Sequence, residues 1–208
     1  RVQAKLRDGV VQGSLSAELA ALQSAEAQLD QGTLQGSFGG KLSSPHSWTL
    51  HAQLEATDAN VGDVRLSRAL VKADGPVTSP RVSVTATDSR GAALRGAGTL
   101  DTRGGFSLRD VDFDVLRGEE HLQGRLASVA QRPSGLELSG LQLSQGSGQL
   151  AGQVSLGSKE IALDLEGNDL ELGSIARTLG LPRGAIEGRA NIKAHLKARG
   201  AERQGSLE

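Results

Sequence analysis

The sequence contains no cysteine, five prolines and few aromatic residues, which make up 2% of its 208 residues. Without cysteine, the chain has no disulfide bonds and no thiolate ligands for a metal. Large rings usually fill the interior of a thick globular core, and here the aromatic side chains are those of Phe38, Trp48, Phe106 and Phe113. The apolar interior must therefore consist of leucine, valine and alanine, a composition that suits a long sheet better than a compact ball.

Excess charge of one sign and long apolar runs are also lacking. With 23 basic and 24 acidic residues, the formal net charge is −1, so the chain lacks the basic field that binds a phosphate backbone, and we expect no nucleic-acid partner. No stretch reaches the roughly 18 to 20 apolar residues that cross a bilayer, and residues 1–20 lack the layout of a signal peptide. Because a strand pattern is already under way at Arg1, we expect a piece of a longer chain.

Alternation of apolar and polar residues dominates the chain and predicts β-strands. In WTLHAQLEA (48–56), tryptophan, leucine and alanine alternate with threonine, histidine, glutamine and glutamate. Turn signals such as Arg7-Asp8-Gly9 separate the alternating stretches. We therefore predict a mainly β fold, an elongated, curved antiparallel β-sheet (a β-taco, or groove) with one apolar and one wet face. The other stretches that alternate are residues 11–19, 64–73, 81–88, 106–116, 135–144, 149–156 and 160–167.

One segment, residues 167–184, breaks the β pattern. Its apolar residues follow helical spacing, and Gly180 and Pro182 end the pattern. The spacing predicts one short α-helix near residues 173–179, whose apolar stripe covers an edge or end of the sheet. The residues of that stripe are Leu172, Ile175, Ala176 and Leu179.

A glycine recurs on the apolar face of the expected strands. It follows an aliphatic residue and, in most cases, a polar one, as in Leu122-Gln123-Gly124. An interior glycine weakens a strand, so it usually marks a bend, a bulge or a close approach to the backbone. The recurrence, about once per hairpin, is typical of an extended repetitive architecture. The glycines in this pattern are Gly13, Gly36, Gly96, Gly124, Gly152 and Gly188.

Residues 161–200 form a succession of a strand, an Asn-Asp-Leu-x-Leu turn, a short helix and an aliphatic-x-Gly strand. Its positions are Asn168, Asp169, Leu170, Leu172, Ile175, Leu179, Ile186, Gly188, Ile192 and Leu196. This succession resembles the recurrent unit of the AsmA-like/TamB family of bacterial envelope proteins. The preceding hairpins are similar to the repeats of the same family, so the resemblance extends over nearly the whole chain.

The resemblance implies a function and a location. It implies a β-groove that carries phospholipid acyl chains across the periplasm between the inner and outer membranes, with an inner-membrane anchor in the full-length protein. It also implies an outer-membrane barrel protein as a further partner. The family brings no catalytic motif and no cofactor, so we expect the chain not to be an enzyme.

Three regions are expected along the chain. Residues 1–166 form a repetitive β-meander that makes the groove, and residues 167–200 form a strand-helix-strand unit that continues it. Residues 201–208 are interpreted as a tail or an artificial end.

The apolar face is the candidate site, because acyl chains require a continuous hydrocarbon surface and gain about 0.8 kcal/mol per buried methylene. An alternative is that this face packs against a second sheet, as in a β-solenoid or sandwich stalk of a surface adhesin that binds no ligand. The residues predicted to line a lipid groove are Leu15, Leu34, Phe38, Leu50, Leu54, Leu122, Leu126, Leu150, Val154 and Ile192.

Other motifs favour surface positions over chemistry. A calcium loop that starts at Asp110 would need glycine and glutamate where Val115 and His121 stand. Alternation instead places Asp110, Asp112 and Asp114 on a solvated strand face. The four histidines lack metal-ligand spacing, and the glycine-rich residues 36–41 do not fit a phosphate loop. We therefore expect no metal site, although a spatially assembled Ser-His-Asp triad is left open by the sequence.

Overall fold

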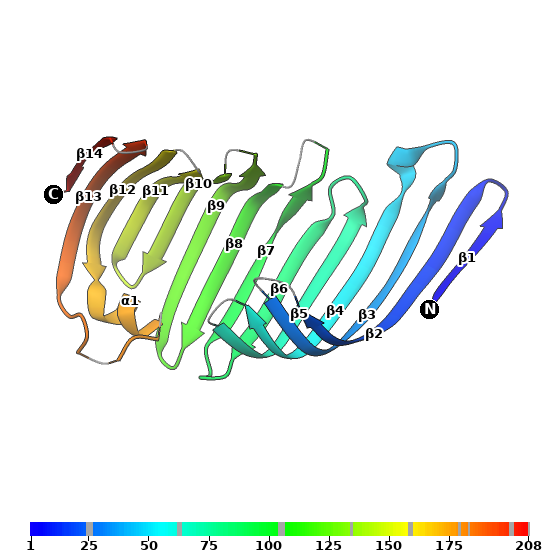
Figure 1. Cartoon of the computed structure of the whole chain (residues 1–208), viewed down its shortest axis with the longest axis horizontal. Helices are drawn as coiled ribbons and strands as arrows, with labels where there is room; N and C mark the ends of the chain where they lie inside the picture. Colours follow the sequence, from blue (N-terminus) through cyan, green and yellow to red (C-terminus); the bar gives the residue numbers. More distant parts are fainter. Residues whose placement is uncertain are drawn as a thin grey trace. The chain divides into compact units, whose positions relative to one another are not determined.

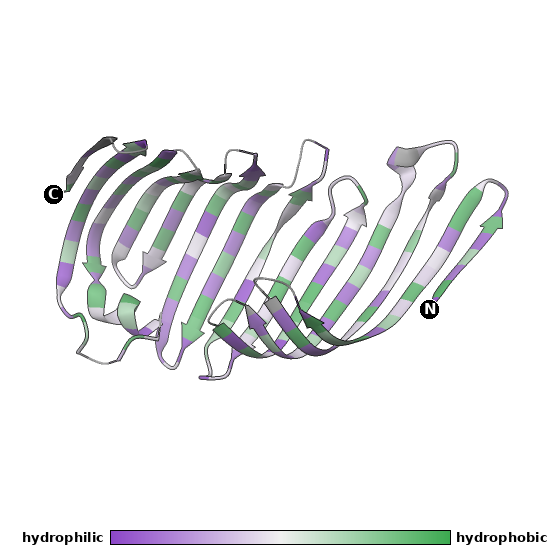
Figure 2. Cartoon of the chain, in the orientation of Figure 1, coloured by the Kyte–Doolittle hydropathy of each residue, from purple (hydrophilic) through white to green (hydrophobic). Residues whose placement is uncertain are grey.

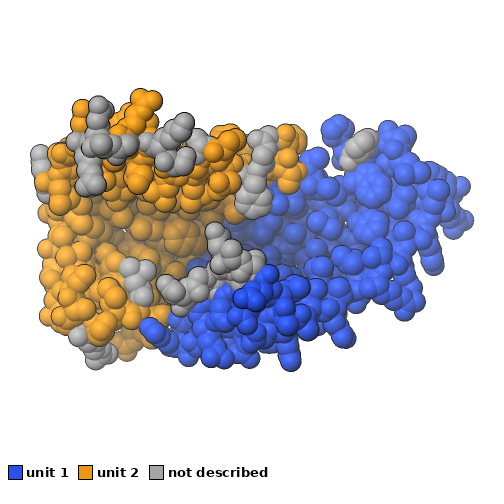
Figure 3. Space-filling model, viewed as in Figure 1, with its two compact units in different colours: residues 1–100 blue, residues 101–208 orange. Residues whose placement is uncertain are grey.

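The computed structural model describes residues 1–23, 27–61, 64–103, 107–133, 135–157, 160–178, 180–182, 184–199 and 202–207. The chain divides into two compact units, Arg1–Leu100 (unit 1) and Asp101–Glu208 (unit 2), coloured separately in Figure 3. The expected boundary at residues 166/167 stays a prediction.

Unit 1 consists of antiparallel strands joined in chain order, with one short 3₁₀ helix. Its elements are β1 (Val2–Arg7), β2 (Val10–Gln23), β3 (Ala27–Lys41), η1 (Pro45–Ser47), β4 (Thr49–Val61), β5 (Val64–Pro76), β6 (Arg81–Asp88) and β7 (Ala93–Asp101).

Unit 2 has the same organisation and contains the helix. Its elements are β8 (Ser107–Arg117), β9 (Glu120–Arg132), β10 (Gly135–Gln145), β11 (Gly148–Gly157), β12 (Glu160–Glu171), α1 (Leu172–Thr178), β13 (Arg189–Arg199) and β14 (Glu202–Leu207). The residues expected to form a tail thus contain β14, which pairs with β13.

The prediction of a mainly β, curved antiparallel sheet with one short helix is confirmed. The described strands are hydrogen-bonded in the order β1 to β14, so each pairs with its neighbours along the chain. Within each unit the strands bend along their length (Figure 1). Apolar and polar residues alternate along them as stripes (Figure 2), and this alternation gives each sheet one apolar and one polar face.

The turns follow from local sequence. Asp8 and Gly9 have φ values of 51° and 75°, the left-handed conformation at both central residues that a two-residue hairpin needs to match strand twist. At the β6–β7 turn, Asp88 Oδ1 accepts hydrogen bonds from the backbone N–H groups of Arg90 (2.8 Å) and Ala92 (2.7 Å). Such a side-chain cap replaces backbone hydrogen bonds where the strand ends.

Alternation is interrupted inside several strands by an aspartate in the left-handed region. In β4, Thr57 and Asp58 are both exposed, and Ala56 and Ala59 on either side are both buried. The strand therefore shifts its alternation by one residue without turning its apolar side chains to water. The aspartates with this conformation inside strands are Asp58 (φ 52°), Asp110 (φ 51°) and Asp169 (φ 50°).

Substitution of Asp110 tests this interpretation. We expect Asp110→Val to lower the free energy of unfolding by about 1–2 kcal/mol, because a Cβ-branched residue is strained at a positive φ. Asp110→Gly should leave the stability unchanged or raise it, because glycine adopts this conformation freely. Urea denaturation measures both. The interpretation is wrong if Asp110→Val unfolds no earlier than Asp112→Val, a control in the same strand at an ordinary φ.

The helix is found where the sequence predicts it, but its buried side differs. α1 covers Leu172–Thr178, and Leu179 lies outside the described residues. The expected stripe was leucine, isoleucine and alanine, whereas Leu172 and Ile175 are half-buried. The residues that α1 buries are Gly173, Ser174, Ala176 and Thr178. A second difference follows the helix: Ile186 and Gly188 precede β13, which begins at Arg189.

Candidate functional site

The apolar face of unit 2 is assembled by strand register. Leu150 of β11 pairs with Leu143 of β10 and Gly167 of β12, and Gly167 pairs with Ile192 of β13. Paired residues point to the same side of a sheet, so such rows define one continuous face. The unit 2 apolar face includes Val111, Phe113, Val115, Leu122, Gly124, Leu126, Leu136, Leu138, Leu141, Leu143, Leu150, Gly152, Val154, Leu156, Ile161, Leu163, Leu165, Gly167, Leu170, Ile192, Ala194 and Leu196.

All five residues predicted for this part of the chain lie on the unit 2 apolar face. Leu126, Leu150, Val154 and Ile192 are half-buried, with one side of each side chain open to solvent. Leu122 differs, because only 8% of its surface is exposed. The space-filling view shows the surface of unit 2 hollowed between its rims (Figure 3).

The five residues predicted in unit 1 also share one face. Leu34 pairs with Leu54, Phe38 pairs with Leu50, and Leu15 pairs with Gly36 on the same side. All five are half-buried. The unit 1 apolar face consists of Val11, Gly13, Leu15, Ala17, Gly32, Leu34, Gly36, Phe38, Leu50, Ala52, Leu54, Ala56, Ala69, Val71, Ala73, Val82, Val84 and Ala86.

These apolar faces are only partly covered by protein. All described strands belong to one sheet order, so among these strands no second sheet packs against either face. The buried apolar residues are mostly alanines, and Leu122 and Leu170 are the leucines among them. A sheet normally buries its apolar face against another layer, which leaves this surface in need of a cover.

The exposed area agrees with an uncovered layer. The chain of 21.5 kDa exposes 13808 Å². Two separate compact proteins of half that mass would together expose roughly 11,000 Å². The exposed area is therefore larger than expected for compact domains, because the described strands form no second layer on the apolar faces. Large exposed apolar patches on soluble proteins usually mark a binding surface.

At two glycines of the apolar faces, Gly13 and Gly124, an aromatic ring occupies the space that a side chain would take. A Cβ built on Gly124 would lie 2.5 Å from Phe113 Cε1, and one built on Gly13 would lie 2.7 Å from Phe38 Cε2. Each ring belongs to the cross-strand partner of its glycine. The sequence left open whether these glycines make room for a ligand or bend the sheet. For Gly13 and Gly124 the structure gives a third role, because an aromatic side chain of the protein itself occupies the space.

The aromatic cluster of unit 1 extends this arrangement. Phe38 and Trp48 stack with ring centroids 6.2 Å apart and an interplanar angle of 12°. Trp48 lies over Gly40, and its Nε1–H donates to the backbone carbonyl of Lys41 at 3.1 Å. The hydrogen bond fixes the indole at the end of β3, so this end of the unit 1 apolar face is closed by rings.

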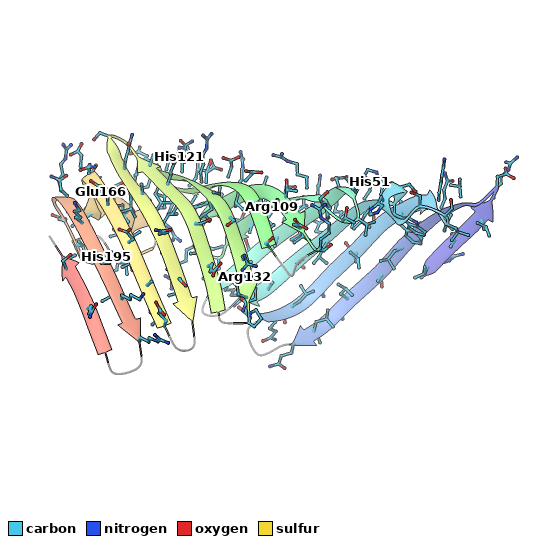
Figure 4. The ribbon with its side chains drawn as sticks, turned by 90° about the horizontal axis from the view of Figure 1, so that it is seen from above. His51, Arg109, His121, Arg132, Glu166 and His195 are labelled. Carbon is cyan, nitrogen blue, oxygen red and sulfur yellow. The ribbon has the colours of Figure 1, made fainter. Side chains whose placement is uncertain are left out.

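The opposite faces carry an ion pair and a histidine–aspartate hydrogen bond between neighbouring strands. Arg125 Nε lies 2.9 Å from Asp112 Oδ1, and His121 Nε2 lies 3.2 Å from Asp114 Oδ1. These pairs confirm a polar strand face for Asp112 and Asp114. Asp110 is exposed as well, but it lies where the alternation of β8 is interrupted. Figure 4 shows His51 and His121 among the side chains that project from the polar side of their strands. Exposed pairs of this kind contribute about 0–1 kcal/mol each.

One row on the polar face of unit 1 brings serine, histidine and aspartate together. Ser37 pairs with His51, His51 pairs with Asp74, and His51 Nδ1 lies 2.6 Å from Asp74 Oδ1. A concavity of about 590 Å³ includes all three. The histidine and aspartate side chains are 62% and 59% exposed, and no hydrogen bond joins Ser37 to His51 among the described residues. A hydrolytic triad needs an oriented nucleophile and a water-excluded oxyanion site. What the described residues show in this row is an exposed hydrogen bond between His51 and Asp74.

Sequence reasoning missed most of each apolar face. Leu141, Leu143, Leu163 and Leu165 line the unit 2 apolar face as fully as the predicted residues do. The signal was available, because they alternate with polar residues in β10 and β12. The prediction concentrated on strands with a glycine motif and on their close neighbours, and so omitted them.

The described residues hold no cluster of three or more histidine, aspartate or glutamate side chains suited to a metal ion. Among these residues, no helix has the length and hydropathy required to span a membrane. Comparisons with models of protein families, with curated proteins and with solved structures found no match to this chain.

Proposed function

We propose that the unit 1 and unit 2 apolar faces bind the acyl chains of phospholipids. The observation that carries the proposal is a face of aliphatic side chains, continuous by register and half-open to solvent, in a layer that the described residues leave without a second sheet. Such a surface shields hydrocarbon from water and needs no polar contact along the tail.

The mechanism is passive shielding. A methylene that moves from water onto aliphatic side chains gains about 0.8 kcal/mol, so a tail that covers several rows binds without a dedicated pocket. Because neighbouring rows offer the same chemistry, a tail can shift along the face with little change in energy. The charged pairs keep the opposite face in water and leave a single face for the lipid.

The wider setting of the proposal comes from the resemblance of residues 161–200 to the AsmA-like/TamB unit. The strand, the helix and the second strand occur there as β12, α1 and β13. The Asn-Asp-Leu-x-Leu stretch, expected as a turn, instead lies in β12 as far as Glu171, with Asp169 in the left-handed region. We propose on this basis a segment of a bridge-like protein that carries phospholipid through the periplasm between the inner and outer membranes. An inner-membrane anchor elsewhere in the full-length protein and an outer-membrane barrel partner belong to the same proposal.

Lipid occupancy tests the proposal. The purified protein should release phospholipid on solvent extraction and show phospholipid adducts in native mass spectrometry. Val154→Asp should lower the occupancy at least fivefold, because a carboxylate on the unit 2 apolar face must lose its water to contact a tail. Gln153→Asp, one residue away on the exposed polar face, should leave the occupancy unchanged.

Two results would contradict the proposal: absence of bound phospholipid, or an equal loss in both variants with unchanged circular dichroism. The alternative, an adhesin stalk with a filled core, predicts the first. A photoreactive residue at position 126 separates the two functions further, because it reaches lipid only if the face is open.

A further inference from the structure

The helix α1 lies on the apolar side of unit 2, at one end of the strands. Gln145 alternates onto the same side of β10 as Leu143, and Glu120 alternates onto the same side of β9 as Leu122. Both polar side chains contact α1. The helix follows the end of β12 and occupies that end of the sheet in Figure 1. It therefore covers the unit 2 apolar face along one rim.

The joint between α1 and the strands is polar. Gln145 Nε2 donates to Ser174 Oγ (2.6 Å) and to Thr178 Oγ1 (3.0 Å). Glu120 accepts hydrogen bonds from Ser174 Oγ and from Arg177 Nε. The buried side of the helix offers small residues and hydroxyl groups, and Thr178 is 2% exposed. The unit 2 apolar face therefore changes from aliphatic to polar side chains at the rim that contacts α1.

One buried atom in this joint has no partner. Gln145 Oε1 accepts no hydrogen bond from the described residues, and a buried unsatisfied acceptor costs about 1–3 kcal/mol. The helix does not satisfy this atom either, so the preference comes from the hydrogen bonds that are made. A tail that displaced the helix would remove the two bonds that Gln145 Nε2 donates to it and the bonds that Ser174 and Arg177 donate to Glu120, and a hydrocarbon offers nothing in their place. Contact between α1 and this rim is therefore favoured over contact between a tail and this rim.

The two rims of the unit 2 apolar face differ in exposure. At the α1 rim, Leu122 and Leu170 are 8% and 5% exposed. At the opposite rim, Leu156, Ile161 and Leu196 are 46%, 44% and 40% exposed, and Leu156 pairs directly with Ile161. One rim is closed by the protein's own helix and the other is open.

We propose that α1 is a stop for acyl chains, which closes one rim of the unit 2 apolar face and confines tails to the part between Leu126 and the open rim at Leu156 and Ile161. This inference rests on the proposed lipid function. In this proposal Leu122 and Leu170 pack beneath α1. Leu122, which the sequence predicts as a groove residue, therefore does not contact lipid. Glu120 and Gln145 mark the limit of the lipid-contacting surface, because they are the first polar side chains after the aliphatic ones on this side of β9 and β10.

A phospholipid with a photoreactive diazirine in its acyl chain tests the stop without altering the protein. After loading from phosphatidylcholine vesicles and irradiation, adducts are mapped by peptide mass spectrometry. We expect adducts at Leu126, Val154, Leu156 and Ile161, and at least fivefold lower yields at Leu122 and Leu170. The double variant Ser174→Ala/Arg177→Ala removes donors to Glu120 and should raise the yields at Leu122 and Leu170 at least threefold. Arg125→Ala, on the polar face, is the matched control and should change neither.

The outcomes separate the two proposals. No adducts anywhere on the face would overturn the lipid function together with the stop. Adducts at Leu122 and Leu170 with yields equal to those at Leu126 and Val154 would overturn the stop alone. An unchanged pattern in the double variant, with native circular dichroism, would show that α1 does not set the boundary and would also overturn it.

Discussion

Gly124→Val is expected to lower the free energy of unfolding by about 3 kcal/mol, at the upper end of typical overpacking effects. Valine suits a strand better than glycine, so propensity alone predicts the opposite sign. The ring of Phe113, however, occupies the space of the new side chain, with Cε1 2.5 Å from the Cβ position. Phe113 is also the cross-strand partner of Gly124, so relief of the clash requires its ring to rotate away from the position it packs over. Urea denaturation followed by circular dichroism measures the loss.

A double-mutant cycle identifies the cause. In a Phe113→Ala background the ring is absent, and Gly124→Val should become neutral or stabilising by up to about 1 kcal/mol, the ordinary gain from replacing a strand glycine. A change from destabilising in the wild type to neutral or stabilising in the Phe113→Ala background would show that position 124 is glycine because the Phe113 ring needs the space. If Gly124→Val destabilises both backgrounds equally, the glycine serves the backbone instead, and the explanation through Phe113 fails.

Gly152→Ala is expected to have an effect of similar size, roughly 3 kcal/mol, from a different clash. A Cβ at this position would overlap the backbone carbonyl oxygen of Asp164 and lie 2.7 Å from Leu165 Cδ2. A backbone oxygen cannot rotate away as a side chain can, so relief requires β11 and β12 to separate locally. The register of β10 against β11 shifts beside this glycine, which shows that the backbone here is already adapted to a close approach.

Gly39→Ala is the matched control for this substitution. Its Cβ would lie 3.3 Å from the carbonyl oxygen of Val11 and 3.6 Å from Gln12 Cγ, distances that small adjustments accommodate. We expect the free energy of unfolding of Gly39→Ala to stay within about 1 kcal/mol of the wild-type value, in either direction. Equal losses for Gly39→Ala and Gly152→Ala in thermal unfolding would refute the argument from the Asp164 carbonyl.

The strands and the two faces could be predicted from the sequence because alternation with period two is a direct signal of a half-buried sheet. All ten predicted groove residues lie on the apolar faces for this reason. The alternation carries no information about what covers a face. Leu122 and Leu126 are equivalent in HLQGRLA, yet Leu122, two residues from Glu120 that binds α1, is buried, and Leu126 is half-buried.

The interruptions of the alternation were missed, although they carry a sequence signal. Residues 57–61 (TDANV), 109–113 (RDVDF) and 168–172 (NDLEL) share a polar residue, an aspartate, an apolar residue, a polar residue and an apolar residue. In each, the aspartate takes the left-handed conformation. The sequence pattern predicts a regular strand face for the second and a turn for the third, whereas both lie in strands whose alternation is interrupted. The predicted buried stripe of α1 was wrong because the strands present the polar side chains of Gln145 and Glu120 to the helix. Ser174 and Thr178 form hydrogen bonds there, which leucine cannot do.

Pairing of each described strand with its neighbours along the chain has a consequence for how the protein folds. Contacts that close over short sequence separations cost little chain entropy, and a low contact order speeds folding. The sheet can therefore grow one hairpin at a time in the order of synthesis, each completed hairpin serving as the template for the next. Because the contacts are local, a destabilising substitution such as Gly124→Val should open β8 to β10 before the other strands. Faster amide hydrogen exchange should then be confined to these three strands.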